Sequence, residues 1–345
     1  MPAQPSPLRP YVPVVCLAVG SMLVAFAYAL YLGHPIKDPD GVAGPAWVRL
    51  PGIVLLFLLA DVLPRTARRA GTAGGVRPAL RSVLAERWPV RRLGVVAIGL
   101  ASFYASYVAY RNMKSFLPFL REDVEDEALL ELDRALAFGN DPATLLHDLL
   151  GTGVSAHVLS AVYLLFLAFV PLSLAAALVW SRSLMTGAFY VTALSLDWLL
   201  GAASYYLLPS LGPVFAAPEL FSRLPETGVS RLQESLYESR LEVLADPVGT
   251  SAVHGIAGFA SLHVAIVLTG CLVARRLALP RLVQVAMWVF FVLTVVSTVY
   301  FGWHYLVDDV AGALLGWGAV VLAARLTGHG RVEAAAEQEL EPSTS

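Results

Sequence analysis

The segment that decides the fold is residues 157–180, HVLSAVYLLFLAFVPLSLAAALVW, which contains no Asp, Glu, Lys or Arg. An α-helix needs roughly 20 apolar residues to cross a hydrocarbon core about 30 Å thick, and this segment is longer than that. It therefore predicts a membrane-spanning helix.

Seven other segments of the chain are similarly apolar: residues 12–32, 47–63, 93–110, 187–208, 258–273, 282–300 and 305–326. The chain of 345 residues is 57% hydrophobic and 14% charged, with a mean hydropathy of +0.67, whereas soluble domains contain about a quarter charged residues. The sequence therefore predicts an all-α integral membrane protein with about eight transmembrane helices, of which the last six form the core. An even number of spans places both termini on one side of the membrane.

The charge and the cysteines limit the possible partners. A formal net charge of -2 and a pI near 6.4 exclude the concentrated basic surface that nucleic-acid binding needs. The expected partners are membrane lipids and small molecules, and the sequence leaves the oligomeric state open. Cys16 and Cys271 both lie in apolar segments, so we expect two small hydrophobic residues rather than a disulfide pair.

The distribution of arginine predicts the orientation. Residues 65–92 contain eight Arg and one acidic residue, and residues 275–281 contain three more Arg. Because short cytoplasmic loops carry an excess of Lys and Arg, the face with these segments is expected to be cytoplasmic. The opposite, extracytoplasmic face holds two long segments, 111–156 and 209–257, whose leucines and acidic residues predict amphipathic helices on the membrane surface. The scarcity of Lys and the abundance of Arg and Ala favour a bacterial plasma membrane.

Polar residues with a recognisable chemistry occur at the extracytoplasmic ends of the predicted spans. His304 and Asp308 are spaced i, i+4 and share one face of a helix, so the carboxylate can accept a hydrogen bond from one imidazole nitrogen. That bond fixes the tautomer and leaves the other nitrogen free to attack. His263 can protonate a leaving oxygen, and Lys114 and Arg121 can hold a phosphoryl group by charge-assisted hydrogen bonds. This chemistry requires no metal and no other cofactor, because cationic side chains neutralise the phosphate charge.

Three other polar residues have competing interpretations. Asp309 also follows His304, but at i+5 it points away from that ring, so Asp308 is the expected partner. Asp197 lies in the middle of a span, where an ionisable residue is costly, and is either functional or a structural hydrogen-bonding residue. His254 is either structural or a contact for a head group.

The polar residues resemble the three motifs of the type 2 phosphatidic acid phosphatase superfamily of lipid phosphatases and phosphotransferases. Its first motif is Lys, six residues, Arg, Pro; Lys114 and Arg121 match it, with Glu in place of Pro. The second motif is Pro-Ser-Gly-His, and residues 260–263, ASLH, keep the Ser and the His. The third is Ser-Arg, five residues, His, three residues, Asp. Residues 297–308, STVYFGWHYLVD, match it except that Thr298 replaces the Arg.

This resemblance assigns a role to each matching residue. His304 is the expected nucleophile, which forms a phosphohistidine, while Asp308 orients it and His263 is the general acid. The expected phosphate contacts are Ser261, Lys114, Arg121 and Arg111. The arginine that is absent at position 298 can be replaced from the outer segments by any of four residues: Arg111, Arg223, Arg231 or Arg240.

The departures from the motifs resemble one branch of the superfamily, the inositol phosphorylceramide synthases, which transfer a phosphoinositol head group between lipids. Residues 205–213, YYLLPSLGP, resemble the same branch. The resemblance implies a lipid phosphotransferase that acts through a phosphohistidine. A lipid phosphate phosphatase of the same superfamily and a non-catalytic lipid-binding or transport protein are the alternatives.

Three regions are expected along the chain. Residues 1–92 contain two N-terminal transmembrane helices and the Arg-rich cytoplasmic loop. Residues 93–328 contain the catalytic six-helix membrane core. Residues 329–345 form an acidic cytoplasmic tail with four Glu.

Overall fold

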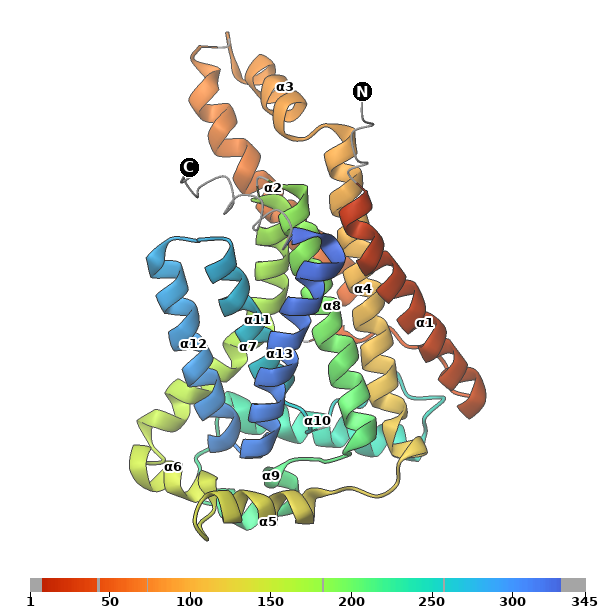
Figure 1. The fold of residues 1–345 in the computed structure, drawn as a ribbon, viewed down its shortest axis with the longest axis vertical. Helices are drawn as coiled ribbons and strands as arrows, with labels where there is room; N and C mark the ends of the chain where they lie inside the picture. Colours follow the sequence, from red (N-terminus) through yellow and green to blue (C-terminus); the bar gives the residue numbers. More distant parts are fainter. Residues whose placement is uncertain (1–7, 42–43, 73, 182, 257, 330–345) are drawn as a thin grey trace, which may run out of the picture.

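The computed structural model describes residues 8–41, 44–72, 74–181, 183–256 and 258–329, whose regular elements are helices apart from one short antiparallel strand pair (Figure 1). The elements in chain order are η1 (Arg9–Tyr11), α1 (Val12–Leu32), β1 (Asp40–Gly41), β2 (Gly44–Pro45), α2 (Ala46–Ala70), α3 (Val76–Arg87), α4 (Val90–Leu120), α5 (Asp126–Leu136), α6 (Pro142–Leu150), α7 (Val154–Val179), α8 (Leu184–Leu207), α9 (Pro213–Ala216), η2 (Pro218–Phe221), α10 (Gly228–Ala245), α11 (Leu262–Arg276), α12 (Arg281–Tyr300) and α13 (Leu306–Thr327). Of the predicted acidic tail, residues 330–345 lie outside the described residues.

Seven of the described helices are long and apolar enough to cross a membrane: α1, α2, α4, α7, α8, α12 and α13. The predicted all-α integral membrane fold is thereby confirmed, with seven candidate spans among the described helices where about eight were expected. The remaining segment, residues 258–273, forms α11 with 15 residues, which at 1.5 Å per residue is about 22 Å long. This helix begins four residues later than the predicted segment because Ser261 caps it and the apolar residues just before Ser261 are in a loop, and it ends three residues later, at Arg276.

The helix α4 is longer than the sequence indicated. The predicted span ends at residue 110, whereas α4 continues to Leu120. Met113, Phe116 and Leu117 in this extension are buried, so packing inside the protein keeps the chain helical beyond the apolar segment. As a result Lys114, expected just beyond the helix, lies within it.

The helices form a bundle with α8 inside. Most of α8 is buried, and it packs against α1, α4, α7, α11 and α13. The apolar side chains of α1, α2 and α12 are largely exposed, as in helices that face lipid. Because α1 packs against α4 and α8, the N-terminal helices share one apolar interior with the rest of the bundle.

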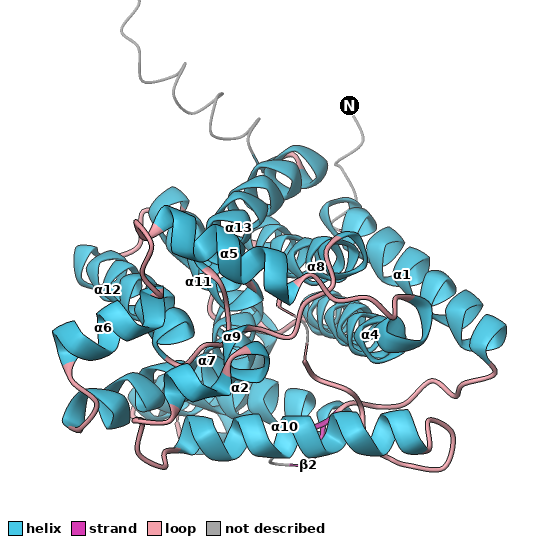
Figure 2. Ribbon diagram, turned by 90° about the horizontal axis from the view of Figure 1, so that it is seen from below, coloured by secondary structure: helices cyan, strands magenta, loops and turns pink. Residues whose placement is uncertain are grey.

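Short helices cover one end of the bundle. The helices α5, α6, α9 and α10 lie across the end where α13 begins, while α3 lies at the opposite end (Figures 1 and 2). The two long polar segments, 111–156 and 209–257, thus contribute their helices to the same end of the molecule, and the Arg-rich segment 65–92 reaches the other.

Candidate active site

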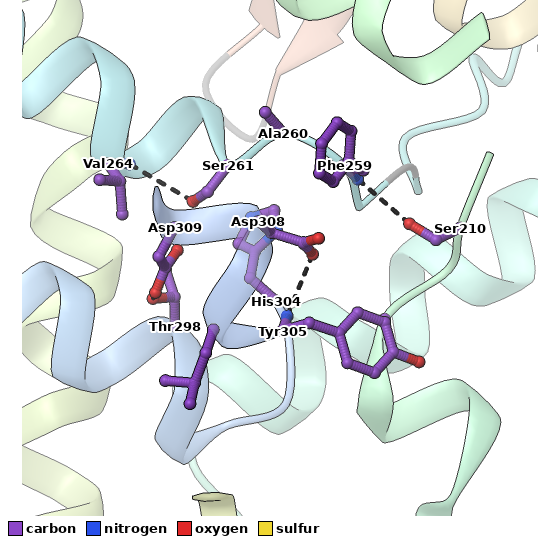
Figure 3. A network of polar contacts seen from close by, with 12 residues as sticks. Ser210, Phe259, Ala260, Ser261, Val264, Thr298, His304, Tyr305, Asp308 and Asp309 are labelled. Atoms are coloured by element: carbon purple, nitrogen blue, oxygen red, sulfur yellow. Dashed lines mark hydrogen bonds and ion pairs between the residues drawn. The ribbon is translucent and has the colours of Figure 1, made fainter. Parts of the chain in front are cut away.

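His304 and Asp308 lie where the chain passes from α12 to α13, at the end that the short helices cover (Figure 3). His304 Nδ1 is 3.4 Å from Asp308 Oδ2, and the backbone N–H of Tyr305 donates to the same oxygen at 3.0 Å. Asp308 is completely buried and His304 is 5% exposed. The carboxylate is held beside Nδ1, so Nε2 is the nitrogen left for a substrate.

His263 faces this pair from the first turn of α11. The centroids of the His263 and His304 rings are 5.8 Å apart. Two aromatic residues of α7 flank the His263 ring: Tyr163 at 4.6 Å and Phe166 at 4.2 Å between centroids. The structure therefore brings both histidines of the sequence motifs into one site, and aromatic packing orients the second ring.

Two glycines of α13 allow this approach. A Cβ atom at Gly312 would collide with the carbonyl oxygen of Ser261, and one at Gly316 with that of Ala265. Small residues spaced in this way let two helix backbones come into contact inside a membrane. The close packing of α11 on α13 therefore sets the separation between the two histidines.

Ser261 and Asp309 have structural partners. The Ser261 hydroxyl accepts a hydrogen bond from an N–H in the first turn of α11, and its own N–H donates to the carbonyl oxygen of Asp308 at 2.9 Å. Thr298 Oγ1 donates to Asp309 Oδ2 at 2.9 Å. The structure thus places Asp308 beside His304 and directs Asp309 to Thr298.

Lys114 is buried in α4 among aromatic residues. Its Nζ lies 3.5 Å from the Tyr110 hydroxyl and 4.9 Å from the centre of the Tyr205 ring. It acts electrostatically on His263 and also on His254, which lies in the loop before α11. Lys114 is therefore the motif cation that the fold places close to the histidines.

Arg121 is two helical turns further along the chain, in the position that ends α4. Its guanidinium donates to the backbone carbonyl of Tyr206. The same residue lines a cavity of about 230 Å³ together with Arg240 and His254. Lys114 does not line this cavity, so the two cations of the first motif occupy different positions.

Two acidic residues that the sequence analysis missed hold the histidine segment in place. Asp126 of α5 accepts hydrogen bonds from the N–H groups of Leu211 and Gly212 and, at 2.9 Å, from the Tyr305 hydroxyl. Asp133, two turns along α5, accepts from the N–H of Leu306 at 2.9 Å, at the start of α13. Their spacing of i, i+7 places both carboxylates on one face of α5, and that pattern is the signal that was available in the sequence.

Burial changes the protonation of these two carboxyl groups. It raises the pKa of Asp133 to about 6, although the N–H of Leu306 favours the ionised form. Burial also raises the pKa of Asp126 above its ordinary value. Both groups therefore hold their protons more tightly in the folded protein than in the unfolded chain.

The segment before the second motif packs against the histidine segment. Gly212 has φ +104°, and a Cβ there would meet the backbone carbonyl of Trp303. The N–H of Val214 donates to the carbonyl of Gly302 at 2.9 Å. Residues 205–213 are thus part of the wall of the site.

Within the described residues, no group of three or more His, Cys, Asp or Glu side chains is arranged to hold a metal ion. Asp197 is completely buried in α8 beside Thr269 of α11, away from the outer end of its helix. The site contains the imidazoles of His263 and His304, the carboxylate of Asp308 and the nearby ammonium group of Lys114.

Comparison with known proteins identifies the family. The family model described as the PAP2 superfamily matches residues 127–322, more than half of the chain. No curated protein and no solved structure matches the chain. The matched residues include both histidines and Asp308 but begin after Lys114 and Arg121. The superfamily that the motifs resemble is thereby confirmed, and the chain belongs to the PAP2 superfamily, whose members are phosphatases and phosphotransferases.

Proposed function

We propose that this protein is a membrane lipid phosphotransferase that acts through a phosphohistidine at His304. The observation that carries the proposal is the contact of 3.4 Å between His304 Nδ1 and Asp308 Oδ2, with the His263 ring 5.8 Å from that of His304. A carboxylate at Nδ1 selects the tautomer in which Nε2 is unprotonated and nucleophilic.

The reaction has two steps. In the first, His304 Nε2 attacks the phosphorus, the bond from phosphorus to the leaving oxygen breaks, and protonated His263 gives its proton to that oxygen. In the second, a hydroxyl group attacks the phosphohistidine, His263 takes up the hydroxyl proton, and the bond between nitrogen and phosphorus breaks. Lys114 neutralises charge on the phosphoryl oxygens in both steps.

Transfer to an alcohol, rather than hydrolysis, is favoured by the surroundings of the nucleophile. His304 is 5% exposed beneath the short helices, so bulk water has limited access to it. Two residues of the second motif are replaced, and the resulting motif resembles that of the inositol phosphorylceramide synthases. This resemblance also favours transfer over hydrolysis. A lipid phosphate phosphatase is the second candidate, since the same phosphohistidine can react with water.

The test is to incubate the purified protein with lipid phosphates and phosphoinositides labelled at phosphorus, with and without acceptor alcohols. We expect an acid-labile phosphoenzyme that His304→Ala abolishes, together with a labelled lipid product that requires the acceptor. His157→Ala, at an exposed position of α7, is the control and should behave like the parent. Release of inorganic phosphate regardless of acceptor would assign a phosphatase. A fully active His304→Ala would overturn the phosphohistidine at His304, and a parent protein that binds these lipids but turns over none of them would favour the non-catalytic lipid-binding or transport protein.

The site is proposed to face the extracytoplasmic side of a bacterial plasma membrane. The histidines lie at the end of the bundle opposite α3 and the Arg-rich segment. Because Arg-rich connections remain in the cytoplasm, the substrate head group would be in the outer leaflet.

A further inference from the structure

The arginines of the outer segments differ in whether a carboxylate neutralises them. Arg223 pairs with Asp148 at 2.8 Å and Arg231 with Glu226 at 3.0 Å, and all four side chains are more than half exposed. No carboxylate in the described part of the chain forms an ion pair with Arg240. Arg240 of α10 is thus a cation whose charge is not balanced by a direct partner.

A buried histidine orients this cation. Arg240 donates from its guanidinium to His254 Nε2 at 3.1 Å, and His254 is 1% exposed. The backbone N–H of His254 donates to Ser115 Oγ at 3.2 Å, which fixes the loop against α4. Burial and then the positive charge of Arg240 lower the pKa of His254 well below its ordinary value, so the ring is neutral and accepts the hydrogen bond.

Further positive charge gathers around the same histidine. Lys114 and Arg111 of α4 also act on His254. The Nε of Arg111 is buried and has no hydrogen-bond partner among the described residues. Bringing several cations together away from water is costly unless an anion joins them. Lys114 is buried and Arg111 and Arg240 are partly buried, so an anion bound among these three cations would be stabilised by all of them.

A cavity gives an anion access to Arg240. It has a volume of about 230 Å³ and is lined by Arg240, His254, Arg121 and Ser210, with Leu and Ile side chains between them and Glu122 exposed beside them. Ser210 also borders the histidine site, because a Cβ at Gly258 would meet Ser210 Oγ and lie 3.4 Å from Asp308 Oδ2. The cavity is thus next to the carboxylate of the histidine pair and has a partly apolar wall.

We infer that Arg240, positioned by His254, binds the phosphate oxygens of the substrate head group in this cavity. This inference rests on the proposed function for the identity of the substrate, but the binding itself does not require turnover. The planar guanidinium can donate two parallel hydrogen bonds to a phosphate, which an ammonium group cannot. Thr298, in contrast, is uncharged and already bonded to Asp309.

The experiment measures binding of inorganic phosphate, and of phosphatidic acid in mixed micelles with phosphatidylcholine, to the full-length protein in detergent. Arg240→Gln is compared with Arg231→Gln, a matched control on the same helix whose arginine is exposed and paired. We expect Arg240→Gln to weaken binding roughly 10- to 100-fold, the effect of losing hydrogen bonds to a charged group. Arg231→Gln should bind like the parent.

Two further variants keep the test decisive. Arg240→Lys, which keeps the charge but loses the guanidinium, should bind with intermediate affinity, and its thermal midpoint shows whether the protein is folded. His254→Asn should also weaken phosphate binding, as Arg240→Gln does, while its thermal midpoint stays close to that of the parent. This result is expected for a residue that positions Arg240.

The two ligands separate the possible sources of the phosphate. A loss with both ligands supports a site for the phosphate group itself, and a loss confined to phosphatidic acid supports a site that also requires the lipid. Equal affinity of Arg240→Gln and Arg231→Gln for both ligands would overturn the inference. His304→Ala distinguishes this failure from that of the proposed function, since it should abolish turnover and keep phosphate binding.

Discussion

In the proposed mechanism, the chemistry of His304 depends on Asp308. Its Oδ2 atom lies beside His304 Nδ1 and is held by the N–H of Tyr305, so an amide at this position would keep the shape but not the preference for one tautomer. We expect Asp308→Asn to lower turnover by about 10⁴, the loss seen when the equivalent change is made in a serine protease triad.

The control for this change is the neighbouring Asp309→Asn. Its carboxylate accepts from Thr298 and forms no hydrogen bond or ion pair with His304 within the described residues, so it acts on that ring only electrostatically and a smaller loss of turnover is expected. Turnover is measured with the substrate that passes the phosphoenzyme test. Equal losses in the two variants would show that the charge of the pair, rather than the orientation of His304, is what matters.

Asp133 gives the fold a dependence on pH. Burial raises its pKa from 3.8 to about 6, so the folded protein binds this proton more tightly than the unfolded chain does. Its contribution to stability is complete below pH 3.8 and is lost as the pH rises through about 6. We therefore expect the thermal midpoint of the parent, relative to Asp133→Asn, to fall as the pH rises from 3.8 to about 6 and to change little at higher pH.

Glu131→Gln serves as the comparison for this measurement. Glu131 is on the same helix and is exposed, so its replacement should shift the midpoint by the same small amount at each pH. A difference between the parent and Asp133→Asn that does not change with pH would contradict the assignment.

At the level of elements, the contact between α11 and α13 is the one that assembles the site. A methyl group at Gly312 would collide with the backbone carbonyl of Ser261, and backbone cannot move aside as a flexible side chain can. We expect Gly312→Ala to push the first turns of the two helices apart, to separate His263 from His304, and to lower phosphoenzyme formation at least about 10²-fold, the lower range for loss of general acid catalysis.

Gly318 on the same helix is the matched control. A Cβ atom there would meet nothing within 4 Å, so Gly318→Ala should leave both activity and thermal stability unchanged. If Gly312→Ala is as active as Gly318→Ala, the two helices are not held at contact distance in the membrane.

The short helix α5 forms hydrogen bonds with two separate segments that border the site. Through Asp126 it holds the loop at 211–212 and the hydroxyl of Tyr305, and through Asp133 it holds the first turn of α13. An amphipathic surface helix thus contributes more than membrane contact, because its buried face supplies acceptors for backbone N–H groups that a helix start leaves unpaired.

At the scale of the whole molecule, the two ends of the bundle differ in charge. The end with the histidines holds α5, α6, α9 and α10, and the other end holds the Arg-rich segment around α3. In a variant with Cys16 and Cys271 replaced by Ser, we expect Asn140→Cys to react with an impermeant thiol reagent added to intact cells, because exposed Asn140 follows α5.

Thr72→Cys, exposed between α2 and α3, should react only after the cells are opened. This result would place the histidines outside the cytoplasm. The reverse pattern of labelling would place the site on the cytoplasmic face and would require a substrate in the inner leaflet.

The sequence by itself determined the features that depend on local patterns. Hydropathy indicated a helical membrane protein, since a span is recognised from about 20 consecutive residues. The pairing of His304 with Asp308 was predicted from an i, i+4 spacing on one helix, but His304 lies in the turn before α13, which begins at Leu306. The start of that helix, where the N–H of Tyr305 donates to Asp308 Oδ2, brings the two side chains together instead. Where local patterns compete with packing, the sequence was less reliable: α11 begins four residues after the start of its predicted segment, and α4 extends ten residues beyond the end of its own.

Only the tertiary structure decided which distant residues meet. The approach of His263 to His304 depends on helix contact at Gly312, and the anchoring of Tyr305 depends on Asp126 from a separate surface helix. The choice of Arg240 among the outer arginines depends on which carboxylates lie nearby in space. Such contacts join residues far apart in the chain, and periodicity carries no information about them because it describes one element at a time. Their distances are set by how the elements pack.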